Sequence, residues 1–318
     1  MHLALIVDPL EDLKPAKDSS IAMWRAAAAR GHQVSAIAAG SLSLLEGVVH
    51  GNASILTMLP RGDTRWCETT ASQRRPLSHF DAVVMRQDPP FDTEYLYSTH
   101  LLELAEQSGV AVFNRPRALR DHNEKLAAVR FPEFTPPTRV GRHADVFREF
   151  LAIHQDIILK PLDGMGGSSI FRVRQGDPNF SVILETLTRH GRETIMAQAY
   201  LPAIVDGDKR ILVVDGEPAP FVLARIPAPG ETRGNLAAGG HGEARPLTAR
   251  DAEIARTVGA YARTQGLLLV GLDVIGEHLT EINVTSPTCM VEILDQTGFD
   301  VAERVIQAIE RHCTAPRA

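Results

Sequence analysis

The first 120 residues alternate short apolar runs with stretches of helical period, and this alternation constrains the fold more than any other feature of the chain. The predicted strands are 3–8, 32–39, 81–86 and 110–114, and the predicted helices are 18–31 and 92–109. The first helix has Asp18 or Ser19 as its N-cap and Gly31 as its stop. Strand, helix and strand in repetition predict a parallel sheet covered on both faces.

Polar residues follow three of these strands, namely Asp8, then Arg86 with Asp88, and then Asn114. Ligands of parallel sheets bind at the carboxyl ends of the strands, so these side chains are candidates for a substrate site. The alternative is that they only cap the strand ends, and the sequence leaves both open.

Composition limits the classes of protein to consider. The chain has 318 residues, enough for two or three domains, and its net charge of −6 argues against a nucleic-acid binder. Its three cysteines are far apart and form no metal-like or disulfide-like spacing, which fits a reducing compartment. No apolar run approaches the roughly 20 residues of a membrane span. We therefore expect a cytoplasmic globular protein without a nucleic-acid or membrane partner.

The pattern changes after residue 122. A helix is predicted near 143–154, and closely spaced strands follow from residue 194 onward. The pair Asp215–Gly216 between two apolar runs is a strong hairpin signal. This part of the chain is expected to be α+β with antiparallel pairing.

The stretch "IILKPLDGMGGSSIFRV" at 157–173 places Lys160 before a group of glycines. It contains no P-loop pattern, and a strand follows where a Rossmann fingerprint would open a helix. A hairpin whose tip carries Gly164 and Gly166 could offer backbone N–H groups to phosphate oxygens, with the ammonium of Lys160 pointing at the same phosphates. A plain turn is the alternative.

The stretch "LVGLDVIGEHLTEINV" at 269–284 predicts two strands joined at a turn centred on Glu277. In that register Asp273 lies directly opposite Glu281, with Cβ atoms roughly 5 Å apart. Asn283 lies on the same face as Glu281, since alternate residues of a strand share a face. Two carboxylates and an amide oxygen suit magnesium bound together with phosphate. A solvated face with a slipped register is the alternative.

Three arginines are further candidates. Arg225 lies in an apolar strand, where its charge is costly unless it meets an anion, and Arg210 lies in the strand before it. Arg233 lies in the loop 227–242, whose five glycines and two prolines are typical of a disordered loop, an active-site lid, or both. Such an arginine could close over a carboxylate or a phosphoryl group. An internal ion pair for Arg225 and a solubilising role for Arg233 are the alternatives.

These stretches, together with "VMRQDPPFDTEYLYSTHLLE", "LRDHNEKL" and "NVTSPT", resemble the ATP-grasp superfamily and, within it, the bacterial glutathione synthetases. The resemblance runs from about residue 3 to 310. It implies an N-terminal α/β parallel-sheet domain (1–122) followed by an ATP-grasp fold of two α+β subdomains. These would be 123–200, with the glycine-rich hairpin, and 201–318, with the metal site and the lid.

The resemblance also implies roles for residues of this chain. ATP would be bound by Lys125, Lys160, Gly164, Gly166, Gly167, Gln198, Tyr200, Leu201 and Asp208. Magnesium, with manganese as an alternative, would be held by Asp273, Glu281 and Asn283. Arg210, Arg225 and Arg233 would be catalytic, and Arg86, Ser286 and Thr288 would bind substrate.

The implied reaction joins γ-glutamylcysteine to glycine through an acyl phosphate and converts ATP to ADP and phosphate, in a homotetramer. One departure is Met290–Val291–Glu292, where family members often have Ile-Arg-Glu, so one anion contact is in doubt. Another ATP-grasp carboxylate–amine ligase and a non-catalytic ATP-binding protein are the rival functions. The joint presence of Lys125, Lys160 and the three metal candidates speaks against the second.

Overall fold

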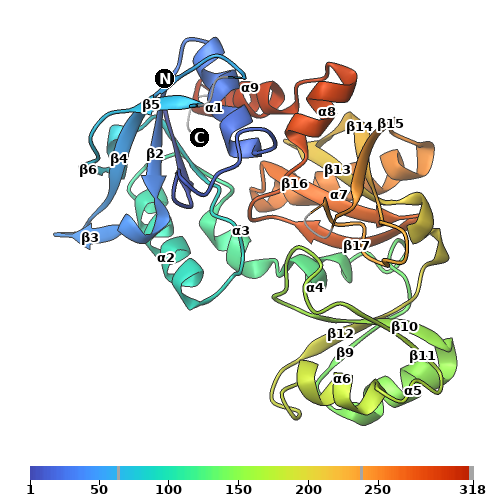
Figure 1. Cartoon of the computed structure of the whole chain (residues 1–318). Helices are drawn as coiled ribbons and strands as arrows, with labels where there is room; N and C mark the ends of the chain where they lie inside the picture. Colours follow the sequence, from blue (N-terminus) through green and yellow to red (C-terminus); the bar gives the residue numbers. More distant parts are fainter. Residues whose placement is uncertain (63–64, 237–238, 315–318) are drawn as a thin grey trace.

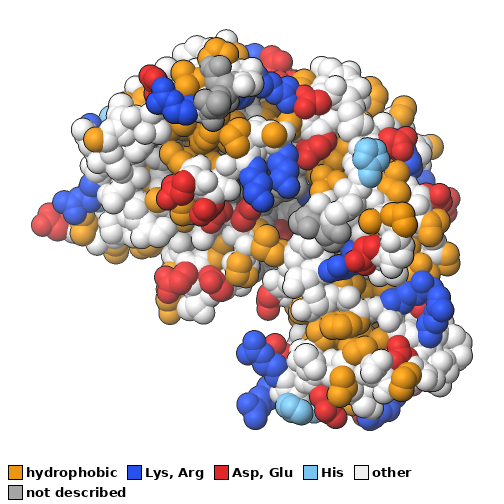
Figure 2. Space-filling view, viewed as in Figure 1, with side chains coloured by type: hydrophobic (Ala, Val, Ile, Leu, Met, Phe, Trp, Pro, Cys, Tyr) orange, Lys and Arg blue, Asp and Glu red, His pale blue; other side chains and the backbone are white. Residues whose placement is uncertain are grey.

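The chain builds three β-sheets in the computed structural model, which describes residues 1–62, 65–236 and 239–314. In Figure 1 an N-terminal sheet and a C-terminal sheet form the upper body of the molecule, and a small four-stranded sheet with its own helices projects below them. Figure 2 shows a notch between the N-terminal part and this projecting part, with Lys and Arg side chains on the projecting part and Asp and Glu side chains on the other side. Among the described residues, no helix has the length and apolar character needed to cross a membrane.

The N-terminal sheet has a parallel core, as the sequence predicts. Its strands are β1 (His2–Val7), β2 (Gln33–Ala38), β7 (Ala82–Met85) and β8 (Val112–Phe113), paired in the order β2-β1-β7-β8. Helices α1 (Ser19–Ala29) and α2 (Thr93–Gln107) lie between them in sequence. The carboxylate of Asp18 accepts hydrogen bonds from Ser20 N and Ile21 N, which confirms it as the N-cap of α1.

This sheet is mixed rather than parallel throughout, which the sequence did not predict. An antiparallel extension consists of β3 (Ser43–Leu45), β4 (Val48–Met58), β5 (Cys67–Thr69) and β6 (Gln73–Pro76), and β4 pairs with β2. Short 3₁₀ turns lie at Ala39–Ser41 and Leu77–His79. The strand β4 alternates buried and exposed residues because only one of its faces is covered. It therefore lacks the continuous apolar run that identified the parallel strands.

The projecting part is a four-stranded antiparallel sheet. Its strands are β9 (Thr138–Gly141), β10 (Asp156–Pro161), β11 (Phe171–Arg174) and β12 (Ile195–Ala199), in the order β11-β10-β12-β9. Helices α5 (Ala144–His154) and α6 (Phe180–Leu187) cover it, and α3 (Pro116–Asp121) and α4 (Glu124–Ala128) lead into it. The predicted β10–β11 hairpin is confirmed. Phe147, Phe150 and Leu159 belong to a separate apolar core here.

The C-terminal sheet is antiparallel, in the order β15-β14-β13-β16-β17. Its strands are β13 (Asp208–Val214), β14 (Glu217–Ile226), β15 (His241–Pro246), β16 (Leu269–Ile275) and β17 (His278–Asn283). Its helices are α7 (Ala249–Gln265), α8 (Met290–Thr297) and α9 (Val301–Thr314), and a 3₁₀ helix spans Pro202–Asp206. Asp215 and Gly216 both have positive φ, 52° and 85°, which confirms the hairpin turn between β13 and β14.

The N-terminal and C-terminal sheets share their apolar cores. One core contains Leu5 of β1 and Ile306 of α9, which lies beside α1 in Figure 1. Arg30 at the end of α1 forms an ion pair with Glu310 of α9, at 2.7 Å between Nη2 and Oε2. The chain end therefore returns to the N-terminal domain and fixes it against the C-terminal sheet.

Asn114, after β8, joins these two sheets rather than facing a ligand. Its Nδ2 donates to Leu269 O at 2.8 Å and to Val284 O at 2.9 Å, and its Oδ1 accepts from Leu269 N at 2.9 Å. Three hydrogen bonds from one buried side chain satisfy backbone groups of β16 and of the segment after β17. Asn114 therefore ties the two sheets together, a structural role that differs from the strand-end cap that the sequence left open.

We expect Asn114→Ala to lower the free energy of unfolding by about 3 kcal/mol, since each buried polar group left unpaired costs roughly 1–3 kcal/mol. Urea unfolding followed by circular dichroism measures the change. The control is Asn52→Ala on the exposed part of β4, which should change stability by no more than about 0.5 kcal/mol. Equal stability of the two variants would contradict the proposed role of Asn114 as a tie between the sheets.

Candidate active site

A cavity of about 160 Å³ lies between the four-stranded sheet and the C-terminal sheet. Strands β13, β16 and β17 form one wall, and the glycine-rich loop after β10 forms the opposite wall. The segment after β12 and the segment before β15 close its ends. The predicted site residues that line it are Lys125, Lys160, Gly164, Gly166, Gly167, Gln198, Tyr200, Leu201, Asp208, Arg210, Arg233, Asp273, Glu281, Asn283 and Ser286.

The glycine-rich loop requires glycine for two reasons. Gly166 and Gly167 have φ of 61° and 80°, in the left-handed region that favours glycine. A Cβ on Gly167 would also lie 2.6 Å from Oδ1 of Asn235, which belongs to the segment before β15. The loop is therefore shaped so that another part of the chain, or a ligand, approaches its backbone closely.

The pairing of Asp273 opposite Glu281, and of Gly271 opposite Asn283, is confirmed in the β16–β17 hairpin. The turn itself differs from the prediction. Ile275 pairs with His278, so the turn has two residues, Gly276 and Glu277, rather than a centre at Glu277. The register shifts after Val274, and Thr280 is the extra residue that restores the predicted pairing at the carboxylates.

Cationic side chains surround the two carboxylates. Asp273 contacts Arg210 Nε at 2.6 Å and Arg225 Nη2 at 2.8 Å, and Glu281 contacts Lys125 Nζ at 3.0 Å. Burial alone would raise the pKa of Asp273, but the two guanidinium groups outweigh burial and hold this pKa below its usual range. Asp273 is therefore a stable anion in the interior of the protein.

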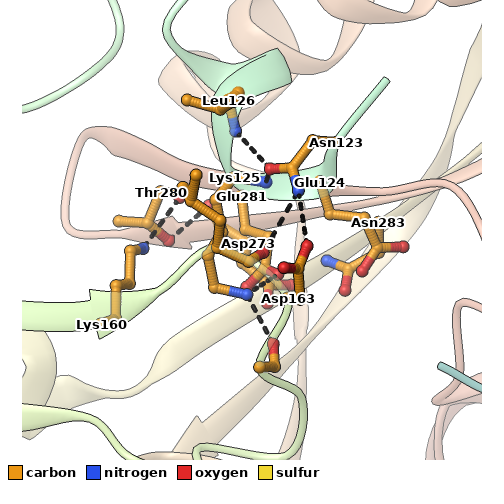
Figure 3. Close-up of polar contacts among 12 residues, drawn as sticks. Asn123, Glu124, Lys125, Leu126, Lys160, Asp163, Asp273, Thr280, Glu281 and Asn283 are labelled. Carbon is orange, nitrogen blue, oxygen red and sulfur yellow. Dashed lines mark hydrogen bonds and ion pairs between the residues drawn. The ribbon is translucent and has the colours of Figure 1, made fainter. Parts of the chain in front are cut away.

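These oxygen atoms fit a magnesium ion. Among the described residues, no group of three or more His, Cys, Asp or Glu side chains could hold a metal alone. Asp273, Glu281 and Asn283 supply two carboxylates and one amide, and Nδ2 of Asn283 donates to Gly271 O at 3.1 Å, which leaves its Oδ1 as the acceptor. Magnesium in phosphate-binding sites commonly takes one or two carboxylates and completes its shell with phosphate and water. Figure 3 shows these side chains facing the lysines of the opposite elements.

Two buried lysines reach this region from different elements. Lys125, on α4, donates to Gly164 O at 2.6 Å and to Glu281 Oε1 at 3.0 Å. Burial would lower the pKa of Lys125, but the Glu281 carboxylate outweighs burial and raises it. Lys160, on β10, donates to Thr280 O at 3.3 Å and to no other group among the described residues, and burial lowers its pKa to about 8. The ammonium of Lys160 has more capacity to take up a ligand oxygen.

The far end of the cavity is less polar. Ile158, Ile204 and Ile275 line it together with Tyr200, whose ring is stacked by Arg172 at 3.4 Å from the ring centroid. Asp208 lies near this end, and its Oδ1 has no hydrogen-bond partner among the described residues. Burial raises the pKa of Asp208 to about 6 against the opposing charge of Arg225. An apolar slot with one available acceptor suits a nucleoside.

The predicted lid 227–242 contacts the glycine-rich loop. Arg233 donates to Gly167 O at 3.1 Å and forms an ion pair with Glu231 at 2.6 Å. Thr232, Gly234 and Asn235 line the cavity with it. Residues 237–238 of the predicted lid lie outside the described residues.

Three predicted site residues do not line the cavity. Arg225 is buried in ion pairs with Asp208 and Asp273, which is the alternative that the sequence left open. Arg86 is buried at the end of β7, where its Nε donates to Ser20 Oγ at 3.1 Å. Thr288 is exposed. Their roles toward a substrate stay predictions.

Comparisons with known proteins cover nearly all of the chain. Residues 1–120 match the family model described as the prokaryotic glutathione synthetase N-terminal domain, and residues 124–298 match that of the prokaryotic glutathione synthetase ATP-grasp domain. A glutathione synthetase of Nitrosomonas europaea is 60% identical over 314 residues, which span 98% of both chains. One of Pseudomonas aeruginosa is 55% identical over 315 residues, 99% of both chains.

The chain belongs to the prokaryotic glutathione synthetase family. It is an ATP-dependent carbon–nitrogen ligase with the ATP-grasp fold. Among solved structures, D-cycloserine synthetase DcsG has a TM-score of 0.67 at 16% identity, over 99% of this chain and 100% of its own. The ATP-grasp ligase PsnB, solved with a minimal precursor, Mg and ADP, has a TM-score of 0.62 at 16% identity, over 98% of both chains. These two structures support the fold alone.

The sequence did not single out Glu124, a cavity residue of this glutathione synthetase family member. It is part-buried and accepts hydrogen bonds from the backbone after β17. In "HNEKL" it follows a helix N-cap, where a glutamate usually interacts with the helix dipole in solvent. No local signal reveals these contacts, because their partners lie in a segment 160 residues away in sequence.

The lowered pKa of Lys160 predicts how nucleotide binding depends on pH. Below about 8 the ammonium is charged, and above it the amine is neutral and loses its attraction for a triphosphate. We expect the affinity for ATP, measured without added metal by calorimetry, to fall roughly 10-fold between pH 7 and pH 9. A hydrogen bond to a charged group contributes about 1.5–3 kcal/mol, and 1.4 kcal/mol is tenfold.

The matched variant is Lys160→Gln, which should bind ATP weakly at both pH values and show no such step. Lys125, whose pKa is raised, stays charged over this range. The same pH dependence in the variant, or a flat profile in the unsubstituted protein, would contradict the assignment to Lys160.

Proposed function

We propose that the chain joins the cysteinyl carboxylate of γ-glutamylcysteine to the amine of glycine, with conversion of ATP to ADP and phosphate, in the cavity between the four-stranded and C-terminal sheets. One observation carries the proposal. In a full-length relative of glutathione synthetases, two lysines, a glycine-rich loop and a paired set of carboxylates line a single cavity. Each of these parts suits phosphoryl transfer, which depends on positioning and charge neutralisation rather than on a protein nucleophile.

ATP would lie along the cavity with its base against Tyr200 and the segment Gln198–Leu201, and with its ribose at Asp208. The proposal rests on the apolar side chains there and on the unpartnered Oδ1 of Asp208. The triphosphate would extend toward Lys125 and Lys160, under the backbone of Gly164, Gly166 and Gly167. Backbone N–H groups at a glycine-rich turn are suited to phosphate oxygens.

Asp273, Glu281 and Asn283 would hold magnesium, with manganese as the alternative ion. When bound, such an ion neutralises phosphate charge and orients the β- and γ-phosphoryl oxygens. Arg210 and Arg225 would keep Asp273 ionised and fixed, which is what their contacts of 2.6 and 2.8 Å support. Arg210 also lines the cavity, so it can in addition face the reacting carboxylate, as the resemblance implies.

In the first step, a carboxylate oxygen of the cysteinyl residue attacks the γ-phosphorus, the bond to the β–γ bridging oxygen breaks, and ADP leaves. The product is an acyl phosphate, and the two lysines offset the negative charge near the transferring group. In the second step, the glycine amine attacks the acyl carbon, phosphate leaves, and the amine loses a proton. Ser286, Arg86 and Thr288 would hold the peptide substrate, of which only Ser286 lines the cavity among the described residues.

The segment 227–242 would close over the acyl phosphate and exclude water from it. Its contact with the glycine-rich loop, from Arg233 Nη1 to Gly167 O at 3.1 Å, supports this proposal because it joins the segment to one wall of the cavity. Arg233 would then lie beside the transferring phosphoryl group and stabilise its charge.

We further propose a homotetramer in the cytoplasm, with domain boundaries near residues 122 and 200. The assembly rests on the resemblance and the location on the spacing of the cysteines. The boundary at 200 is supported by the separate core of the four-stranded sheet. Sedimentation equilibrium tests the assembly, and a monomer would overturn it.

Val291, buried on α8, takes the place of the family's common arginine, so the anion contact at that point would come from another residue.

The reaction is tested by measuring ADP release with magnesium, ATP, γ-glutamylcysteine and glycine, and then with each substrate left out. We expect release that depends on both substrates, with glutathione formed in equal amount to ADP. Release with a different carboxylate and amine would keep the ligase class and overturn the substrates. Nucleotide binding without turnover on any pair would favour a non-catalytic ATP-binding protein.

Glu281→Gln should lower turnover by roughly 100-fold or more, with the thermal midpoint little changed. Loss of a residue that only supports a metal ligand costs about 10-fold to 100-fold, and Glu281 is proposed as a ligand itself. The matched control is Glu277→Gln, two residues beyond β16 in the exposed turn of the same hairpin. The assay is ADP release over a range of magnesium concentrations. Equal activity of the two variants would remove Glu281 from the metal site.

A further inference from the structure

Glu124, at the first position of α4, holds the segment that connects strand β17 to Ser286 and Thr288, the predicted substrate-binding residues. Its Oε1 atom accepts three hydrogen bonds, from Val284 N at 2.8 Å, Thr285 N at 3.1 Å and Thr285 Oγ1 at 2.9 Å. Val284 and Thr285 lie between Asn283 and Ser286. Hydrogen bonds to a carboxylate are stronger than those between neutral groups, so this segment is held firmly against α4.

The neighbours of Glu124 on either side hold other parts of the cavity. Asn123, the N-cap of α4, donates to Leu162 O and to Asp163 Oδ1, both at 3.3 Å, at the start of the glycine-rich loop. Lys125 contacts Gly164 O and Glu281. Three consecutive side chains therefore contact the glycine-rich loop, the carboxylate hairpin and the segment after it, as Figure 3 shows for Asn123 and Lys125.

Burial makes the carboxylate of Glu124 costly. The side chain is part-buried, and burial and the charge of Glu281 both raise its pKa. A glutamine could accept the same hydrogen bonds without the cost of a buried charge. The position of this segment is therefore maintained against an electrostatic penalty, which points to a role in the site rather than in stability alone.

We propose that Glu124 is a positioning residue: it fixes Val284 and Thr285 so that the amide of Asn283 and the hydroxyl of Ser286 take their places relative to the phosphate-binding lysines. This rests on the proposed function, because it assigns those two side chains to the metal and to the peptide substrate. Glu124 acts through the backbone at 284–285 and makes no bond to a reacting atom.

The test compares Glu124→Gln, Glu124→Ala and Thr285→Val, with Glu149→Gln on the exposed face of α5 as the control. Glutamine keeps an acceptor at Oε1, alanine removes it, and Thr285→Val removes one of its three donors. The first measurement is the affinity for a non-hydrolysable ATP analogue with and without magnesium. The second is the KM for γ-glutamylcysteine, and the thermal midpoint reports on folding.

The quantity to compare is the factor by which magnesium raises the affinity for the analogue. In Glu124→Ala we expect this factor to be about 10-fold to 100-fold smaller, and the KM for γ-glutamylcysteine to rise by a similar factor. The affinity without magnesium should stay near that of the control. Glu124→Gln should recover most of the loss, and Thr285→Val should fall between the two. This order supports a role through hydrogen bonds at 284–285.

Two results would overturn the proposal. If Glu124→Gln is as impaired as Glu124→Ala, the charge acts on the reactants directly. If Glu124→Ala lowers the affinity for the ATP analogue equally with and without magnesium, or leaves this affinity unchanged, Glu124 does not position Asn283 for the metal. Should Glu124→Ala fail to fold, Glu124→Gln and Thr285→Val decide by the same criteria. The analogue measurement needs no peptide product, so it reports on Glu124 even if the chain makes a product other than glutathione.

Discussion

The arrangement of the site depends on one unfavourable contact, the placement of Asp273 directly opposite Glu281 in the β16–β17 hairpin. Like charges facing each other across a ladder destabilise it, and burial strengthens their repulsion. The surrounding elements offset this cost. Strands β13 and β14 contribute Arg210 and Arg225 to Asp273, and helix α4 contributes Lys125 to Glu281. The cations of three separate elements are thus brought to one hairpin, and the cavity forms where they meet.

The remaining parts of the site are held in place by backbone contacts rather than by charge. Thr280 Oγ1 donates a hydrogen bond to Asp273 O. The carbonyl oxygen of Thr280 accepts a hydrogen bond from Lys160, which belongs to the four-stranded sheet. The glycine-rich loop is held from one side by Lys125 and from the other by Arg233. Phosphoryl transfer needs accurate placement of groups more than it needs a reactive side chain, and such cross-links between sheets provide that placement.

The sequence predicted what depends on local patterns. The parallel strands, the N-cap of α1, the Asp215–Gly216 turn and the hairpin register at Asp273 follow from apolar periodicity and turn chemistry, and the structure confirms them. The antiparallel strands β3 to β6 were missed because a half-exposed strand has no continuous apolar run. The roles of Asn114, Arg225 and Glu124 were open or unseen because their partners lie far away in sequence, and no spacing rule reveals a contact of that kind.

The pairing of Asp273 with Glu281 is explained if their carboxylates hold a divalent cation beside the phosphates of ATP. The most direct measurement is an anomalous difference map from crystals of the protein grown with ADP and Mn²⁺, which substitutes for Mg²⁺ at oxygen-rich sites. We expect a manganese peak within bonding distance of oxygen atoms of Asp273, Glu281 and Asn283, with ADP phosphate completing the coordination shell of the ion. A peak held by other side chains, or ADP bound with no peak at these three side chains, would contradict this assignment.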